Sequence, residues 1–94
     1  MPHVRIEHAV PDFAAWKQLF DSDPADRKGS GVRRYQIFRA RDDANVVMID
    51  LEFDRIEAAE AFVDALERLW QGPAKAIMQN PRARIVDRVE SAEL

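Results

Sequence analysis

The sequence has no cysteine and no threonine, and only three of its 94 residues are glycine. Without cysteine, disulfides, thiolate metal sites and cysteine nucleophiles are excluded. Serine is also scarce, because only Ser22, Ser30 and Ser91 occur, each beside Asp, Gly or Glu in a segment typical of a loop or tail. A serine hydrolase is therefore not expected.

Long apolar runs and an excess of positive charge are missing as well. No stretch approaches the roughly 20 apolar residues that a membrane-spanning helix needs, and residues 1–6 lack the pattern of a secretory signal. We therefore expect a cytoplasmic protein with no membrane partner. The formal net charge is -3, whereas nucleic-acid binding depends on a basic surface. We expect no nucleic-acid partner.

The residues that are present are those of a folded protein, with 47% hydrophobic and 33% charged side chains. A chain of 94 residues is long enough for one hydrophobic core but not for two. We expect a single domain over residues 1–94.

Alternation of polar and apolar residues predicts strands in this chain. The expected strands span residues 3–9, 32–40, 46–53 and 82 to about 90. Asp42, Asp43 and Asn45 supply turn residues between the second and third strands, so these two strands should form a hairpin. A short apolar turn over residues 74–78 should precede the last strand.

Apolar residues at helical spacing predict a helix after the first strand and another after the third. The first helix should begin at the N-cap Asp12 and end near residue 22, or one turn later near residue 28. The second should begin at the N-cap Asp54, with Glu57 in the capping-box position, and end at residues 72–73, a Gly-Pro pair.

This order of elements predicts an α+β fold of ferredoxin-like βαββαβ topology. The compact arrangement of such a chain is a four-stranded antiparallel sheet with both helices on one face. The residues of alternate parity that should face the helices are Val4, Ile6, Val47, Ile49, Leu51 and Phe53.

The second face of the sheet is expected to be of mixed character. Val46, Met48, Asp50 and Glu52 share one parity of the third strand. Charged and polar residues dominate the same parity of the first and fourth strands. The strand at residues 32–40 is apolar on both parities, with Val32 and Phe38 on one and Tyr35 and Ile37 on the other. Strands with this pattern have both faces covered. A second copy would cover the face without helices, giving a homodimer; an open, half-polar sheet in a monomer is the alternative.

The segment of residues 8–21 resembles the first strand–helix junction of small proteins of the dimeric α/β barrel superfamily. The resemblance rests on an Asp-aromatic-x-x-Trp-x-x-x-Phe pattern, formed here by Asp12, Phe13, Trp16 and Phe20. Further matching features follow in the same order, namely Arg27, Gly31–Val32, residues 42–45 and residues 56–62. The resemblance implies an Asp-Asp-Pro-Asn turn at residues 42–45, and this sequence has Ala44 in place of the proline.

The resemblance implies a fold and a dimer more than a reaction. The superfamily includes antibiotic-biosynthesis-type monooxygenases, cyclase-like and isomerase-like enzymes, haem-degrading proteins and stress-responsive proteins, and many members of unknown function. No catalytic motif of the superfamily transfers onto this sequence.

The two histidines cannot share a metal ion, because His3 and His8 lie five residues apart on one strand and should face opposite sides of the sheet. We expect no metal site and no cofactor. His8 is the best catalytic candidate, since it should lie near the start of the first helix and Trp16. It would act as a general base or a hydrogen-bonding group, or else it is a structural histidine.

Trp16, Arg27 and Tyr35 are the candidate ligand-binding residues. Trp16 could form an aromatic pocket with Phe20, Phe62 and Trp70, although such a stripe also suits a core. Arg27 is expected to hold an anion at a pocket mouth or to interact with the carboxyl end of the first helix. Tyr35 would orient a ligand or place its hydroxyl at the rim of the sheet.

Two function classes remain open. The first is a metal-free protein that binds or transforms a small apolar or aromatic metabolite, in the manner of a cyclase or a monooxygenase. The second is a non-catalytic dimeric module, stress-associated or bound to a protein partner. An RNA-recognition domain shares the topology but is disfavoured, because Asp50 and Glu52 occupy the strand face where stacking aromatics are needed.

Overall fold

The computed structural model describes residues 1–24, 26–72 and 79–94. Its elements follow the predicted β-α-β-β-α-β order, and their bounds are β1 (Pro2–Ala9), α1 (Phe13–Asp21), β2 (Val32–Arg39), β3 (Val46–Phe53), α2 (Ile56–Gln71) and β4 (Gln79–Asp87). The last strand therefore starts earlier and ends earlier than predicted. The apolar turn expected at residues 74–78 lies outside the described residues.

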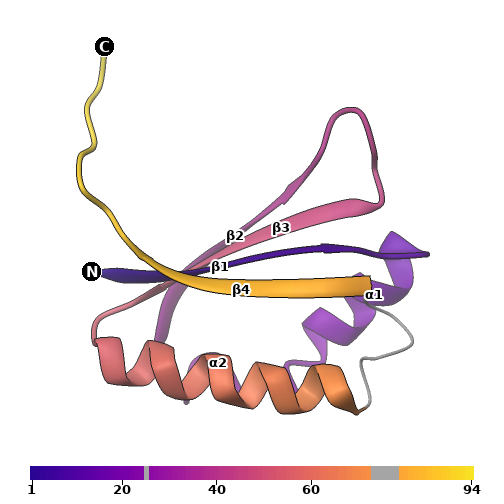
Figure 1. Ribbon diagram of the computed structural model, residues 1–94, viewed down its shortest axis with the longest axis horizontal. Helices are drawn as coiled ribbons and strands as arrows, with labels where there is room; N and C mark the ends of the chain where they lie inside the picture. The colour runs from indigo at the N-terminus through magenta and orange to yellow at the C-terminus, as the bar shows by residue number, and fades with distance from the viewer. Residues whose placement is uncertain (25, 73–78) are drawn as a thin grey trace.

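The strands β1 to β4 form one antiparallel sheet in the order β2-β3-β1-β4. The helices α1 and α2 lie on the same face of this sheet (Figure 1). The predicted ferredoxin-like α+β fold is confirmed.

The core forms where the apolar parities of β1 and β3 meet α2. Alternate residues of β3 are buried because neighbouring positions on a strand point to opposite faces. The buried hydrophobic residues are Val4, Ile6, Val10, Trp16, Val47, Ile49, Leu51, Phe53, Ala59, Phe62 and Leu66. All six strand residues that were expected to face the helices are among them.

The two helices begin in different ways. Asp12 is the N-cap of α1, as predicted, and its Oδ1 accepts a hydrogen bond from the Ala14 backbone N–H at 3.0 Å. The predicted N-cap of α2 was wrong, because Arg55 takes that position and makes no side-chain cap hydrogen bond. Asp54 instead forms an ion pair with Arg33, at 3.2 Å. The capping box with Glu57 is therefore not formed.

Strand β2 corrects a second expectation. Its pairing with β3 shifts register between Val32 and Arg34, so that Val32 lies opposite Phe53. Val32 consequently packs against the core and not on the helix-free face with Phe38. The other three apolar residues keep the predicted parity, since Tyr35 pairs with Leu51 and Ile37 with Ile49 on one face, and Phe38 pairs with Met48 on the other.

The segment between α1 and β2 contains tight turns where a further helical turn to residue 28 had been considered. The helix ends at Asp21 with Ser22 as C-cap. Asp23 and Asp26 then adopt positive φ values of 56° and 50°, which residues other than glycine rarely adopt. Gly31 has φ 97°, and a Cβ there would lie 3.2 Å from the Cβ of Ala58, so this position requires glycine.

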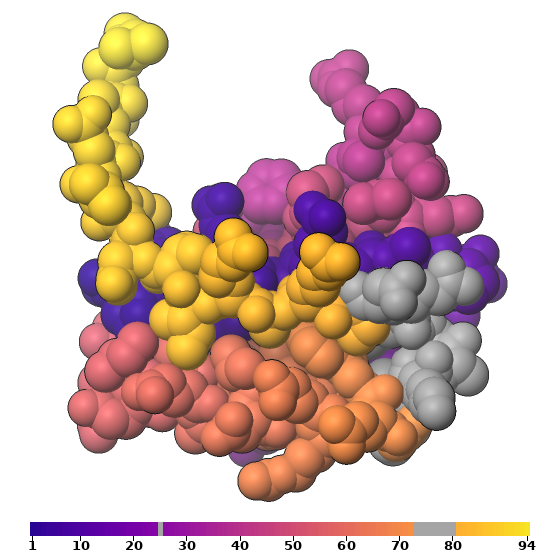
Figure 2. Space-filling view, viewed as in Figure 1, coloured from indigo at the N-terminus to yellow at the C-terminus, as the bar shows by residue number. Residues whose placement is uncertain are grey.

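The helix-free face of the sheet is a groove with a volume of about 880 Å³. Residues from all four strands line it, including Arg5, Phe38, Met48, Arg84 and Val86. The β2–β3 turn and the chain after β4 both rise on this side of the molecule (Figure 1), and Figure 2 shows them as two projections with a lower saddle between them. The face therefore has a concave shape.

Candidate ligand pocket

A small apolar pocket lies between the helices and the sheet. Its volume is about 60 Å³. Side chains from α1, α2, β1 and β3 and the segment after α1 line it, namely Ile6, Leu19, Phe20, Pro24, Arg27, Ile49, Leu51, Phe62, Leu66, Leu69 and Trp70. Among the described residues of this lining, Arg27 is the only charged one, so the described part of the pocket is apolar with one cationic side chain at its edge.

The guanidinium of Arg27 is held in place by the end of α1. Nη1 donates a hydrogen bond to the backbone carbonyl of Phe20 at 2.6 Å. The guanidinium also lies over the Phe20 ring, 3.8 Å from its centroid, and 5.1 Å from the centroid of Tyr35. A guanidinium stacked on aromatic rings gains roughly 0.5–2 kcal/mol, and its orientation is restricted.

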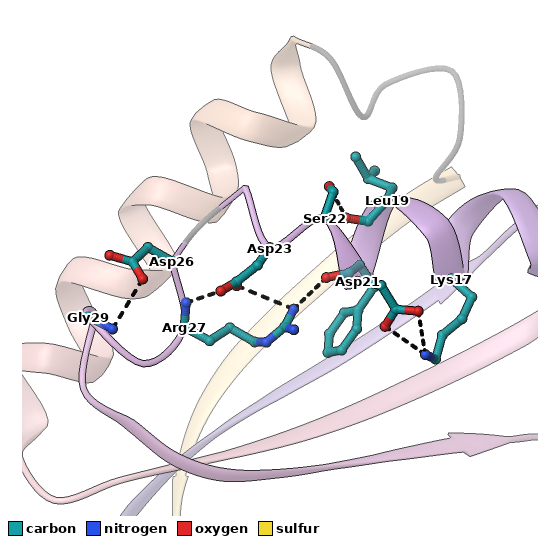
Figure 3. Close-up of polar contacts among 9 residues, drawn as sticks. Lys17, Leu19, Asp21, Ser22, Asp23, Asp26, Arg27 and Gly29 are labelled. Carbon is teal, nitrogen blue, oxygen red and sulfur yellow. Dashed lines mark hydrogen bonds and ion pairs between the residues drawn. The ribbon is translucent and has the colours of Figure 1, made fainter.

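Asp23 contacts both the backbone N–H and the guanidinium of Arg27 (Figure 3). Its Oδ1 accepts a hydrogen bond from the Arg27 backbone N–H at 2.9 Å and lies 3.5 Å from Nη1 of the guanidinium. The left-handed backbone of Asp23 makes this double contact possible, and such conformations in residues other than glycine cost about 1–3 kcal/mol.

Contacts between aromatic rings connect the four site residues that were predicted from the sequence. His8 packs on Trp16 with ring centroids 5.2 Å apart, Trp16 on Phe20 at 5.3 Å, and Phe20 on Tyr35 at 5.1 Å. Arg27 joins the series through Phe20 and Tyr35. The structure therefore brings His8, Trp16, Arg27 and Tyr35 into one cluster, with Phe20 at its centre.

The pocket itself is lined by only part of this cluster. Of the four candidate aromatic residues, Phe20, Phe62 and Trp70 line the pocket, whereas Trp16 is buried in the core with 2% of its surface exposed. Sequence reasoning did not identify Pro24 and Leu69, which carry no distinguishing signal among other apolar residues. Nor did it identify Asp23, whose function depends on a backbone conformation.

His8 faces the helices, as predicted, at the end of β1. It is 2% exposed, and neither ring nitrogen has a hydrogen-bond partner among the described residues. Burial lowers the pKa of His8 to about 4, and the neighbouring backbone of Ala9 offsets this shift only in part. The imidazole is therefore neutral near pH 7, a state that can accept a proton. His8 is absent from the pocket lining.

His3 lies on the other face, where Nδ1 donates to Oδ1 of Asp50 at 3.1 Å. The same carboxylate lies 3.8 Å from Nε of Arg5, and Glu52 pairs with Arg34 at 3.4 Å. Asp50 and Glu52 are thus ion-paired residues of the helix-free face. Within the described ranges, no group of three or more His, Asp or Glu side chains could hold a metal ion.

A wider, open basin lies on the outer side of Arg27, with a volume of about 910 Å³. Residues from the α1–β2 segment, β2 and the start of α2 line it. Its charged residues are Asp23, Arg27, Lys28, Arg33, Arg34, Asp54 and Arg55, and Tyr35 also contributes. Arg27 therefore separates an apolar interior pocket from a basin in which cations outnumber carboxylates.

Solved structures with this architecture include proteins with described activities. Rv0793 from Mycobacterium tuberculosis is 13% identical with a TM-score of 0.70, and the match covers 99% of this chain and 100% of that one. SnoaB from Streptomyces nogalater, described as a cofactor-independent oxygenase, is 14% identical with a TM-score of 0.70 over 96% of this chain and 94% of its own. A further structure, described as an antibiotic biosynthesis monooxygenase, is 15% identical with a TM-score of 0.65, covering 96% and 100% of the two chains.

This chain has the fold of these proteins. The neighbours are of the antibiotic-biosynthesis-monooxygenase-like type that the sequence resembles, and at these identities they establish the fold alone. No protein-family model and no curated protein sequence matches the chain. Among the described residues, neither helix is long and apolar enough to cross a membrane.

Proposed function

We propose that this protein binds a small, flat, apolar molecule in the pocket between its helices and its sheet. The observation that carries the proposal is the pocket's composition, in which apolar and aromatic side chains enclose a space bounded by one fixed guanidinium. Ligand sites in proteins commonly combine an apolar lining with a few placed polar groups. SnoaB, which has the same fold, is described as a cofactor-independent oxygenase, and this supports chemistry without a metal.

The size of the pocket defines what must move on binding. An apolar cavity of about 150 Å³ accommodates benzene, whereas this pocket measures about 60 Å³. Leu19, Leu69 and Trp70 are only partly buried and lie toward the carboxyl ends of the helices. Their side chains must shift to admit a ring, so binding should be detected at Trp70.

His8 is our candidate general base for a cyclase- or monooxygenase-like reaction of that ligand. Its imidazole is neutral near pH 7, and its nitrogens have no partner among the described residues. A pKa of about 4 makes it a weak base, so efficient proton abstraction requires a bound ligand that stabilises the imidazolium. Trp16 packs against the ring, and His8 is outside the pocket lining. Proton transfer from the ligand therefore requires Trp16 to move or the ligand to extend past Phe20.

We further propose that the protein is a homodimer whose subunits meet through the helix-free sheet face. Phe38 is 50% exposed there and Met48 is half-buried, in a groove that also contains complementary charges. Homodimers with twofold symmetry are the commonest oligomers. A cytoplasmic location remains a prediction from the sequence.

Binding is tested by titrating the protein with 1-naphthalenemethanol, a neutral flat molecule, and following the indole N–H signals of Trp16 and Trp70 by NMR. We expect a saturable shift of the Trp70 signal that exceeds the shift of Trp16, because Trp70 lines the pocket and Trp16 does not. Variants Trp16→Phe and Trp70→Phe assign the two signals.

A matched pair of variants on α1 locates the binding. Leu19→Phe should fill the pocket and weaken binding, whereas Gln18→Phe, at the exposed neighbouring position, should leave it unchanged. Equal effects of the two substitutions, or no saturable shift in the parent protein, would contradict the proposal. The latter result would favour the non-catalytic interaction module.

A further inference from the structure

We propose that the ligand of this pocket carries a carboxylate on its apolar ring system, and that Arg27 selects it by binding that group at the boundary with the outer basin. The inference rests on the proposed function and specifies its substrate class. It starts from the position of Arg27, whose side chain lines both the apolar pocket and the basin. A ligand that extends across this boundary has an apolar part on one side and reaches cations on the other.

Arg27 has unused donors for such a group. A guanidinium carries five N–H donors in a planar fork. Nη1 is occupied by the Phe20 carbonyl and Asp23, whereas Nε and Nη2 have no partner within the described part of the chain. Nε and one Nη2 hydrogen form the edge that binds a carboxylate through two parallel hydrogen bonds.

The guanidinium is also arranged for binding before a ligand arrives. The contacts with Phe20, Tyr35 and Asp23 restrict its rotation, and its side chain is only 16% exposed. Partial burial strengthens an interaction with an anion because fewer water molecules screen it. A fixed donor pair gains affinity by reducing the entropy lost on binding.

The basin around Arg27 carries a positive net charge, whereas the net charge of the whole protein is negative. Its described lining residues include five cationic and two acidic side chains, although the chain carries a formal net charge of -3. Four of the five cations have carboxylate partners. The guanidinium groups of Arg33, Arg34 and Arg55 pair with Asp54, Glu52 and Glu57, and Arg27 pairs with Asp23 through Nη1 alone.

The cations that remain for a ligand are Arg27, through its free edge, and Lys28, which has no partner among the described residues. Lys28 is exposed and contributes mainly to the local potential. Asp23 is the opposing charge, but its Oδ1 is engaged on the Nη1 side of Arg27. The free edge of Arg27 is therefore the specific contact, and Lys28 assists the approach of an anion.

Calorimetric titration with 1-naphthoate and 1-naphthalenemethanol, which differ chiefly in charge, tests the inference on the full chain. We expect naphthoate to bind about tenfold or more tightly, since a hydrogen bond to a charged group contributes about 1.5–3 kcal/mol. Arg27→Gln should remove this preference while the alcohol still binds, and Arg27→Lys should retain part of it. Arg33→Gln is the matched control, because Arg33 lines the same basin but is paired with Asp54.

The outcomes separate the two proposals. Equal affinities for the two compounds, or a preference that survives Arg27→Gln, would overturn the carboxylate inference and leave the apolar pocket intact. Failure of both compounds to bind would overturn both proposals. Should Arg27→Gln not fold, the parent protein still decides: raised NaCl must weaken naphthoate binding and not alcohol binding, and equal salt dependence would refute the inference.

Discussion

His8 and Arg27 differ in how far their polar atoms are satisfied within the described residues: neither nitrogen of His8 has a partner there, whereas Arg27 is engaged through Nη1 and keeps Nε and Nη2 free. His8 has two buried nitrogens without partners among the described residues, whereas Arg27 contacts two rings, a carbonyl and a carboxylate. A buried polar group without a partner costs roughly 1–3 kcal/mol. The cost of burying His8 depends on the charge of its imidazole, so the contribution of His8 to stability should depend on pH.

Stability should therefore fall on acidification because of His8. Its pKa is about 4 in the folded protein against an ordinary 6.5, so between these values the unfolded chain binds the proton first. The free energy of unfolding then decreases by at most roughly 1 kcal/mol per pH unit as the pH falls from 6.5 to 4. Below pH 4 both states carry the proton and His8 contributes no further loss.

Urea unfolding at a series of pH values measures this dependence. His8→Leu should flatten the part of the slope between pH 6.5 and 4, and the difference from the parent protein removes the contribution of the carboxylates. His3→Gln, which alters the histidine bonded to Asp50 on the opposite face, should keep the His8 slope. An unchanged slope in His8→Leu would show that His8 is not a buried neutral imidazole.

At the scale of elements, the two helix starts differ by one hydrogen bond. Asp12 caps α1 through its side chain, whereas Arg55 leaves the start of α2 without a side-chain cap. Arg55→Ser should supply the missing acceptor and raise the free energy of unfolding by about 0.5–2 kcal/mol, and Asp12→Ala should lower it by a similar amount. The exposed Arg55–Glu57 pair that is lost contributes little.

Chemical denaturation of both variants measures these changes. Glu57→Gln removes the same ion pair without adding a cap, and it serves as the control for Arg55→Ser. A loss of stability in Arg55→Ser would mean that the start of α2 is already satisfied in another way.

The same comparison shows what periodicity can predict. The strands and the helix-facing residues followed from the alternation of Val47, Ile49, Leu51 and Phe53, because burial on one face imposes that pattern. The cap at Asp54 and the parity of Val32 were wrong for local reasons. Asp54 forms an ion pair with Arg33, and a register shift turns Val32 toward the core. Both differences arise from contacts that β2 makes in the folded chain.

The sequence predicted only those parts of the site that follow from the positions of the helices and strands. The junction of β1 and α1 placed His8 near Trp16, and the 5.2 Å between their rings agrees with that expectation. The dual contact of Asp23 with Arg27 depends on a positive φ that no residue pattern announces. The division between pocket and basin therefore emerged only from the folded chain.

At the scale of the whole molecule, the two faces of the sheet are unequal. The helices cover one face (Figure 1). The other face is a groove that contains the exposed Phe38 ring, half-buried Met48 and several charged side chains. Arg5 and Arg84 lie directly opposite each other on β1 and β4. Like charges in this arrangement are destabilising unless anions lie nearby. Asp50 of the same chain lies 3.8 Å from Nε of Arg5, and in the proposed homodimer a carboxylate of the second copy would further offset the charge of Arg84.

Sedimentation velocity tests the homodimer, and we expect the parent protein to sediment as a dimer at micromolar concentration. Met48→Glu should shift it to a monomer, because a carboxylate buried without a partner in the interface costs several kcal/mol. Ala61→Glu adds the same charge on the exposed surface of α2 and should leave the dimer unchanged. A parent protein that is monomeric at this concentration would mean that the groove is not covered by a second copy, and the apolar pocket would then have to function within a single subunit.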